Sequence, residues 1–139
     1  MVKRLEQAVR AIMDDRLRPR GLTTLQYTAL SALRRGGLSS AQLARRSFVR
    51  PQTMHQMILT LEERKLIERR RDPSNRRVLL IRLTAEGTSL LRECEPVVRE
   101  IEEQMLGGMP GEQRTAFRGG LEYGYQELAK IVNPSLAAD

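Results

Sequence analysis

The stretch from Val49 to Thr84 constrains the fold of this chain more than any other. Pro51 suits the first position of a helix, because the N–H that proline lacks would have no helical partner there. The apolar side chains that follow recur at helical spacing and form one face: Met54, Met57, Ile58 and Leu61. Polar side chains fall largely on the other face: Gln52, Thr53, His55, Gln56 and Thr60. Such side chains can donate and accept hydrogen bonds at the edges of bases in a DNA groove.

The pattern changes from helical to extended after Lys65. Residues 66–69 and 78–83 are predicted to form two strands, and the sequence Asp72-Pro73-Ser74-Asn75 between them indicates a turn. A helix followed by a β-hairpin with arginines at its turn is the arrangement of a winged helix-turn-helix.

Charge is distributed unevenly along the chain. The 139 residues carry a net charge of +7, and residues 33–82 alone hold 13 basic and 4 acidic side chains, a net charge of +9. Residues 1–32 carry +3 and residues 83–139 carry −5. A basic excess confined to one segment indicates a polyanionic partner, here double-stranded DNA. The alternative is a solvated face that only keeps the protein in solution.

Several classes of protein are disfavoured by the sequence. No apolar run approaches the roughly 20 residues that a membrane-spanning helix needs. The first residues carry charges at Lys3, Arg4 and Glu6 without a following apolar segment, which argues against a secretory signal. The single cysteine, Cys94, cannot form an intramolecular disulfide and suits a reducing compartment. We therefore expect a cytoplasmic protein that does not enter the membrane.

Three helices are predicted before Val49. Residues 2–18 form an amphipathic helix that ends near Pro19, and a second helix begins at a threonine cap, Thr23 or Thr24. Ser39 or Ser40 caps a short third helix over residues 41–46. Residues 47–49 form a turn, which contains no glycine. A short helix, a turn and the polar-faced helix thus follow one another as in a helix-turn-helix.

Two more helices are predicted after Thr84, over residues 85–106 and 112–132, with a glycine-rich break between them and an end at Asn133-Pro134. Their apolar stripes favour a homodimer with two-fold symmetry, whereas packing onto their own winged domain is the alternative. The predicted fold is mainly α with a small β-hairpin, in one domain over residues 1–139. Residues 22–84 form its winged helix-turn-helix, and residues 1–20 and 85–132 its dimerisation helices.

The sequence resembles the MarR family of bacterial transcriptional regulators over nearly its whole length. The resemblance lies in Leu22-Thr23 with Gln26-Tyr27, in residues 38–44, in residues 61–69, and in Asp72-Pro73 followed by residues 76–84 and Gly87. The family implies a dimeric winged helix-turn-helix protein that binds promoter DNA. Many members release the DNA when a small phenolic or lipophilic molecule, or an oxidant, binds.

The resemblance also suggests roles at the hairpin turn. Arg77, together with Arg76, looks like the family's minor-groove arginine, which gains from the negative potential of a narrow groove. The alternative is a solvated turn arginine. The chain departs from the family at three positions: Asn75 stands where an Asp commonly helps to hold that arginine, Gln56 where Arg is frequent, and Arg50 where a small cap residue is frequent. Base preference therefore cannot be transferred from relatives.

Further DNA contacts are predicted around these two features. The polar residues expected to meet either base edges in the major groove or phosphates are Gln52, Thr53, His55 and Gln56. The residues expected to contact phosphates, which position the protein without reading sequence, are Ser40, Arg50, Arg69 and Arg70.

Other candidate sites have weaker support in the sequence. Met13, Tyr27, Met54 and Met57 could line an effector pocket between helices, although such residues more often pack in the core. His55 is the only histidine, so neither a metal site nor a Cys–His nucleophile pair is indicated, and no cofactor is expected. Cys94 lies on an apolar helical stripe and is interpreted as core packing; oxidant-sensing relatives carry their reactive cysteine in the N-terminal helix region, where this chain has none.

The leading hypothesis is a sequence-specific transcriptional regulator that acts as a repressor. It would bind a palindromic promoter site as a homodimer, and a small lipophilic or phenolic effector would release it. The alternative is a non-specific architectural DNA-binding protein, which would show the salt dependence of phosphate contacts but little preference between sequences. An enzyme is not indicated, because the sequence contains no paired acid and base residues, phosphate-binding loop or ligand cluster.

Overall fold

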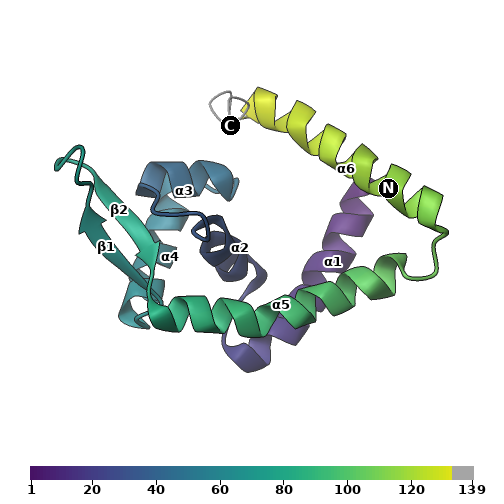
Figure 1. Ribbon diagram of the computed structural model, residues 1–139, viewed down its shortest axis with the longest axis horizontal. Helices are drawn as coiled ribbons and strands as arrows, with labels where there is room; N and C mark the ends of the chain where they lie inside the picture. Colours follow the sequence, from purple (N-terminus) through teal and green to yellow (C-terminus); the bar gives the residue numbers. More distant parts are fainter. Residues whose placement is uncertain (133–139) are drawn as a thin grey trace. The chain divides into compact units, whose positions relative to one another are not determined.

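The computed structural model describes residues 1–132, which are helical apart from one β-hairpin, as the sequence predicts. The chain divides into two compact units, with a first unit over residues 1–101 and a second unit that begins at Glu102. The elements in chain order are α1 (Val2–Leu17), the 3-10 helix η1 (Arg18–Arg20), α2 (Thr24–Ala32), α3 (Ser40–Arg46), α4 (Pro51–Glu63), β1 (Ile67–Arg71), β2 (Leu79–Leu83), α5 (Ala85–Leu106) and α6 (Gly111–Val132) (Figure 1). None of these helices is both long enough and apolar enough to cross a membrane.

Reciprocal side-chain caps start α2 and α3. The Thr23 hydroxyl accepts the backbone N–H of Gln26 (3.1 Å), and the Gln26 side chain accepts the N–H of Thr23 (3.0 Å). Ser39 and Gln42 form the same pair at the start of α3, at 3.2 and 2.9 Å. Each capping box satisfies two backbone donors that a helix N-terminus leaves without partners. Of the alternatives left by the sequence, the structure thus selects Thr23 and Ser39.

A carboxylate of α1 supports the start of α2 from outside that helix. Asp14 accepts both the hydroxyl (2.6 Å) and the backbone N–H (2.8 Å) of Thr24. These two hydrogen bonds stabilise the charged form and hold the pKa of the Asp14 carboxyl below its ordinary value. Asp14 therefore fixes α1 against α2, a contact that the helical patterns did not reveal.

Both helices of the helix-turn-helix end at a non-glycine residue in the left-handed region. Phe48 follows α3 with φ +54°, and Lys65 follows α4 with φ +60°. In each case the next residue bonds back across the turn, Val49 N–H to the Ala44 carbonyl (3.1 Å) and Leu66 N–H to the Leu61 carbonyl (3.0 Å). Such closing hydrogen bonds satisfy the last carbonyls of a helix, while a left-handed residue other than glycine costs about 1 kcal/mol. The sequence did not predict these two conformations.

The core of the first unit forms around the apolar face of α4. Met54, Ile58 and Leu61 are at most 1% exposed, and they join buried residues from the other helices and the hairpin of this unit. The two strands pair antiparallel, from Ile67 opposite Leu83 to Arg71 opposite Leu79. Each strand begins one residue later than predicted, and β1 extends two residues further.

Leu38 forms an isolated antiparallel β-bridge with Ile81 of β2. Its N–H donates to the Ile81 carbonyl (3.1 Å), and its carbonyl accepts the Ile81 N–H (2.7 Å). This bridge attaches the segment before α3 to β2. The sequence pattern around Leu38 indicates only the start of a helix, so this pairing was not predicted.

The two ends of the hairpin meet at one tight junction. Thr84 N–H donates to the Leu66 carbonyl (3.1 Å), and the Thr84 hydroxyl donates to the Lys65 carbonyl (2.6 Å). The same hydroxyl accepts the N–H of Gly87 (3.0 Å) and so caps α5. A Cβ at Gly87 would lie well inside van der Waals contact with the Leu66 carbonyl oxygen, so only glycine fits there.

Helix α5 remains continuous through Pro96. Proline removes one helical hydrogen bond, but buried side chains hold the helix on both sides: Leu91 and Cys94 before it, Val97 and Ile101 after it. Cys94 is 0% exposed, which confirms its interpretation as core packing, and burial raises the pKa of its thiol.

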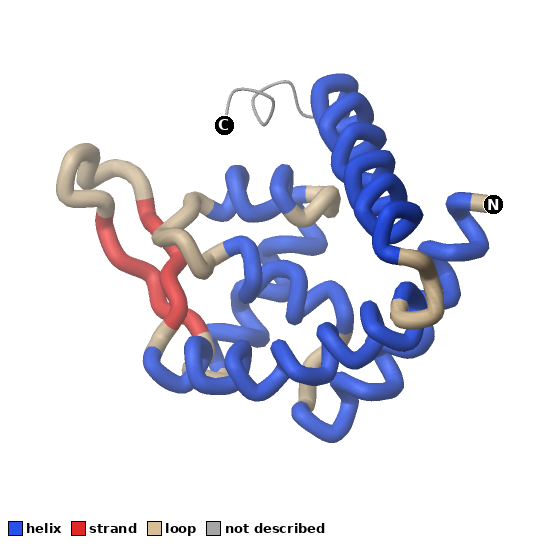
Figure 2. Tube along the Cα trace, turned by 45° about the vertical axis from the view of Figure 1, so that its right-hand side comes forward, coloured by secondary structure: helices blue, strands red, loops and turns tan. Residues whose placement is uncertain are grey.

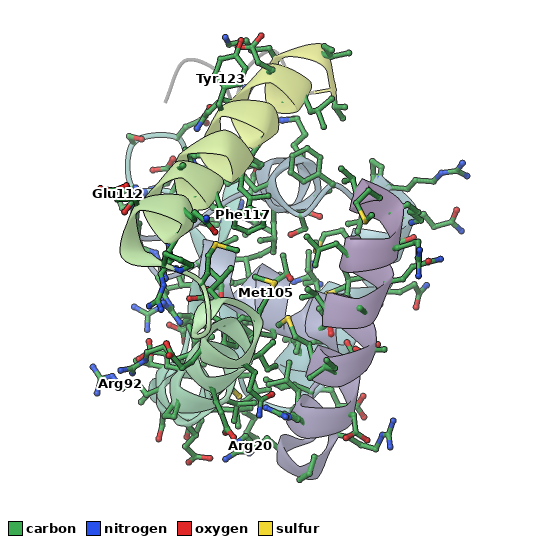
Figure 3. All side chains as sticks on the ribbon, turned by 90° about the vertical axis from the view of Figure 1, so that its right-hand side faces the viewer. Arg20, Arg92, Met105, Glu112, Phe117 and Tyr123 are labelled. Atoms are coloured by element: carbon green, nitrogen blue, oxygen red, sulfur yellow. The ribbon has the colours of Figure 1, made fainter. Side chains whose placement is uncertain are left out.

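The second unit contains the turn between the end of α5 and α6. The Arg114 guanidinium donates to the Gly107 carbonyl (3.2 Å) at the end of α5. Along α6, large apolar side chains are exposed, among them Tyr123 (70%), Leu128 (63%) and Ile131 (77%). Tyr123 projects outward from this helix in Figure 3. The predicted end at Asn133-Pro134 lies outside the described residues.

Substitution of Gly87 tests the junction. We expect Gly87→Ala to lower the free energy of unfolding by about 3 kcal/mol, because the new methyl group collides with a backbone carbonyl that cannot move alone. Gly111→Ala is the matched control, since the methyl group it would add meets no heavy atom of residues 1–132 within 4 Å beyond its chain neighbours and the nearby backbone of its own helix. Urea unfolding of both variants measures the difference. Equal midpoints for Gly87→Ala and the unsubstituted protein would contradict the close approach.

Candidate DNA-binding site

Helix α4 divides into a buried face and an exposed face. The predicted base-reading residues are all exposed on it: Gln52, Thr53, His55 and Gln56. Arg50, also exposed, occupies the N-cap position, and Pro51 follows as the first helical residue. Because Met54, Met57, Ile58 and Leu61 are buried, α4 cannot rotate without exposing its apolar face. The packing of the core therefore determines which side chains of α4 face the solvent.

Ser40 lies at the start of the preceding helix. Ser39 is the residue that caps α3, so the hydroxyl of Ser40, the first helical residue, is not needed for the cap. Ser40 is exposed. This placement suits the phosphate contact predicted for it.

Two of the predicted phosphate-binding arginines pair with carboxylates of their own chain. Arg69 Nε lies 3.0 Å from a Glu62 carboxylate oxygen, which joins β1 to the last turn of α4. Arg70 Nε lies 2.8 Å from a Glu68 carboxylate oxygen on the same strand. Both arginines therefore have a carboxylate partner within the chain. Neither glutamate was predicted from the sequence as a partner of these arginines.

The turn of the hairpin is held by local hydrogen bonds (Figure 2, where it is the tan segment between the two red strands). Asp72 N–H donates to the Val78 carbonyl (2.9 Å), closing the ladder. The Asp72 carboxylate accepts the backbone N–H (2.9 Å) and the hydroxyl (2.8 Å) of Ser74. These hydrogen bonds hold the pKa of the Asp72 carboxyl below its ordinary value. The turn is therefore ordered by its own polar side chains.

Arg76 and Arg77 are exposed residues of this turn. The Asn75 side-chain oxygen accepts the backbone N–H of Arg77 (3.2 Å), so Asn75 supplies a hydrogen-bond acceptor where the family commonly has Asp. The carbonyl of Arg76 accepts Nη1 of Arg71 (2.7 Å). Arg71 was not among the predicted site residues, and no spacing rule would have identified a strand-end arginine that reaches back to its own turn.

The four predicted effector-pocket residues belong to, or pack against, the core of the first unit. Met54 is 0% and Met57 8% exposed, and both lie in the core cluster. Met13 and Tyr27 are partly buried and pack against that cluster. The structure thus brings these residues to one core, and their role in binding an effector stays a prediction.

An exposed polar helix face and an arginine-bearing hairpin on one helix-turn-helix unit define a DNA-binding protein of the winged helix-turn-helix class. A profile of the MarR family matches residues 20–78. The chain also aligns with the HTH-type transcriptional repressor Rv2887 of Mycobacterium tuberculosis, with 33% identity over 123 residues, 88% of each chain. The chain belongs to the MarR family and is a DNA-binding transcriptional regulator.

Solved structures of other regulators share its fold. CouR from Rhodococcus jostii bound to p-coumaroyl-CoA has a TM-score of 0.80 and 26% identity, and the match covers 96% of this chain and 90% of CouR. BpsR from Bordetella bronchiseptica, whose DNA binding is regulated by 6-hydroxynicotinic acid, has a TM-score of 0.78 and 29% identity, with 89% of each chain covered. Rv2887 in complex with p-aminosalicylic acid has a TM-score of 0.73 and 32% identity, with 88% of this chain and 93% of that one covered.

Proposed function

We propose that this chain represses transcription by binding a palindromic promoter site as a homodimer. In each protomer the exposed face of α4 lies in the major groove, and Arg76 and Arg77 enter the adjacent minor groove. The observation that carries the proposal is the division of α4, whose buried face fixes the direction of its polar face. The proposed site of action is the cytoplasm, where promoter DNA lies, and the proposed activity is binding without catalysis.

Titration of the protein's own upstream DNA tests the proposal. We expect a labelled duplex of that region to bind at least about a thousandfold more tightly than a scrambled duplex, the lower end of typical specificity ratios. Fluorescence anisotropy at several salt concentrations separates the phosphate contacts, which weaken with salt, from base readout. Equal affinity for both duplexes would instead identify a non-specific architectural protein.

Arg77→Ala tests the contribution of the hairpin turn. We expect specific binding to weaken by about 1–3 kcal/mol, the contribution of one good groove contact. Because Arg77 is exposed on the turn, the variant should retain its fold and its oligomeric state. Anisotropy with the upstream duplex measures the affinity, and size-exclusion chromatography with light scattering measures the mass. Unchanged affinity would remove the hairpin from the mechanism.

The homodimer is supported by apolar surface on the helices outside the winged part. On α6 the exposed side chains include Leu121 (49%), Leu128 (63%) and Ile131 (77%). Exposed apolar patches of this kind commonly mark association surfaces. Two-fold association would also set the two reading helices about 34–36 Å apart, one turn of DNA.

Substitution within the apolar stripe tests the dimer. Leu128→Asp should convert the dimer to a monomer and weaken binding to the upstream duplex, because a charge then enters a desolvated interface. Gln113→Asp is the control, since it adds the same charge at an exposed polar position of α6. Sedimentation velocity distinguishes the two species. A Leu128→Asp protein that sediments as the unsubstituted dimer does would exclude this part of α6 from the interface.

We also propose that a small aromatic acid is the effector. The supporting observations are the aromatic ligands of CouR, BpsR and Rv2887 and the clustering of Met13, Tyr27, Met54 and Met57 at one core. A bound effector should raise the melting temperature, because it binds only the folded state. A thermal-shift series with salicylate, 6-hydroxynicotinate and p-coumarate checks this. If no compound shifts the melting temperature at millimolar concentration, this effector class is excluded.

A further inference from the structure

The peptide group between Arg76 and Arg77 is held from both sides. Its carbonyl oxygen accepts Nη1 of Arg71 at 2.7 Å, and its N–H donates to the side-chain oxygen of Asn75 at 3.2 Å. A peptide group is planar, so two hydrogen bonds at its opposite ends restrict rotation of the whole group. The two side chains that flank this peptide are the arginines of the hairpin turn.

The surrounding turn supplies part of this restriction, and Arg71 adds to it. The other hydrogen bonds of the turn join Asp72 to Val78, Asp72 to Ser74, Asn75 to Asp72 and Val78 to Asn75. The Val78–Asn75 hydrogen bond closes a β-turn over residues 75–78, and the Arg76–Arg77 peptide is its central peptide. Arg71 reaches across from the end of β1 and donates a further hydrogen bond directly to this peptide.

We propose that Arg71 is a positioning residue for DNA recognition. Its guanidinium, together with the Asn75 amide, fixes the Arg76–Arg77 peptide and so directs both arginine side chains before DNA binds. Arg71 acts through its neighbours on the turn and need not contact DNA. The proposal rests on the proposed function of the hairpin turn, and it adds a residue to which that function assigns no contact.

A peptide that is already ordered in the free protein lowers the entropic cost of binding DNA. Ordering one residue's backbone on binding costs about as much free energy as a modest hydrogen bond contributes. Without Arg71 the carbonyl end of this peptide loses its hydrogen bond, so the peptide is less restricted in the free protein and binding must order it. We therefore expect Arg71→Met to weaken binding to the upstream duplex about fivefold to tenfold, the fold-change for ordering one residue. Asn75→Ala should have a similar effect.

A double-mutant cycle distinguishes positioning from direct contact. Arg71→Met is measured in the unsubstituted protein and in a protein that already carries Arg76→Ala and Arg77→Ala. Arg92→Met is the charge control: Arg92 is exposed on α5 and extends away from the helix in Figure 3.

Positioning predicts that the effect of Arg71→Met disappears in the Arg76→Ala/Arg77→Ala background. A loss that persists there in full would show that Arg71 contacts DNA itself, and a loss equal to that of Arg92→Met would show that only charge matters; either result overturns the proposal.

NMR relaxation of backbone amides in the free protein tests, independently of DNA, whether Arg71 restricts the Arg76–Arg77 peptide; we call this restriction the clamp. The order parameter of the Arg77 N–H should fall from about 0.85 to below about 0.6 in Arg71→Met, while the melting temperature stays within a few degrees. An unchanged order parameter overturns the proposal whatever the DNA data show. If instead the order parameter falls but Arg76→Ala/Arg77→Ala binds DNA as the unsubstituted protein does, the clamp exists and the proposed minor-groove contact is wrong.

Discussion

The winged part of this protein depends on the junction at the Leu66 carbonyl. That one oxygen accepts the N–H of Thr84 and faces Gly87 at a distance that no side chain would permit. The junction joins the end of α4 and the start of β1 to the end of β2 and the start of α5. Because four elements meet there, the direction in which the hairpin leaves the helices is set by backbone packing, which tolerates little displacement.

The same junction connects α4 and the hairpin, the two elements proposed to contact DNA. The apolar face of α4 is packed in the core, and β1 leaves α4 through Lys65 in the left-handed conformation. The Arg69–Glu62 ion pair then joins the strand back to the last turn of that helix. Helix α4 and the hairpin are therefore joined by both a backbone turn and an ion pair, so a displacement of α4 in its packing would also displace the hairpin.

The sequence predicted those features that rest on periodicity and on local caps. The apolar stripe of α4, the start of α3 at Ser39 or Ser40 and the hairpin between Lys65 and Thr84 are all present in the structure. Features that depend on tertiary contacts were missed. Neither Phe48 nor Lys65 carries a local signal for a left-handed conformation, since glycine is the usual residue there. Leu38 pairs with Ile81 over a separation that no local pattern encodes.

At the candidate site, the sequence predicted a minor-groove contact for the turn arginines and phosphate contacts for Arg69 and Arg70, but it gave no indication of their partners within the chain. The structure distinguishes them by their partners. Arg69 and Arg70 pair with glutamates, and Arg71 donates to a carbonyl of the turn. Arg76 and Arg77 lie on the turn to which Arg71 donates. The basic excess of the segment therefore has two roles, because part of it builds the hairpin and part of it faces outward. A count of positive charges alone would overestimate how many phosphates the hairpin neutralises, and the salt dependence of DNA binding should reflect the smaller number.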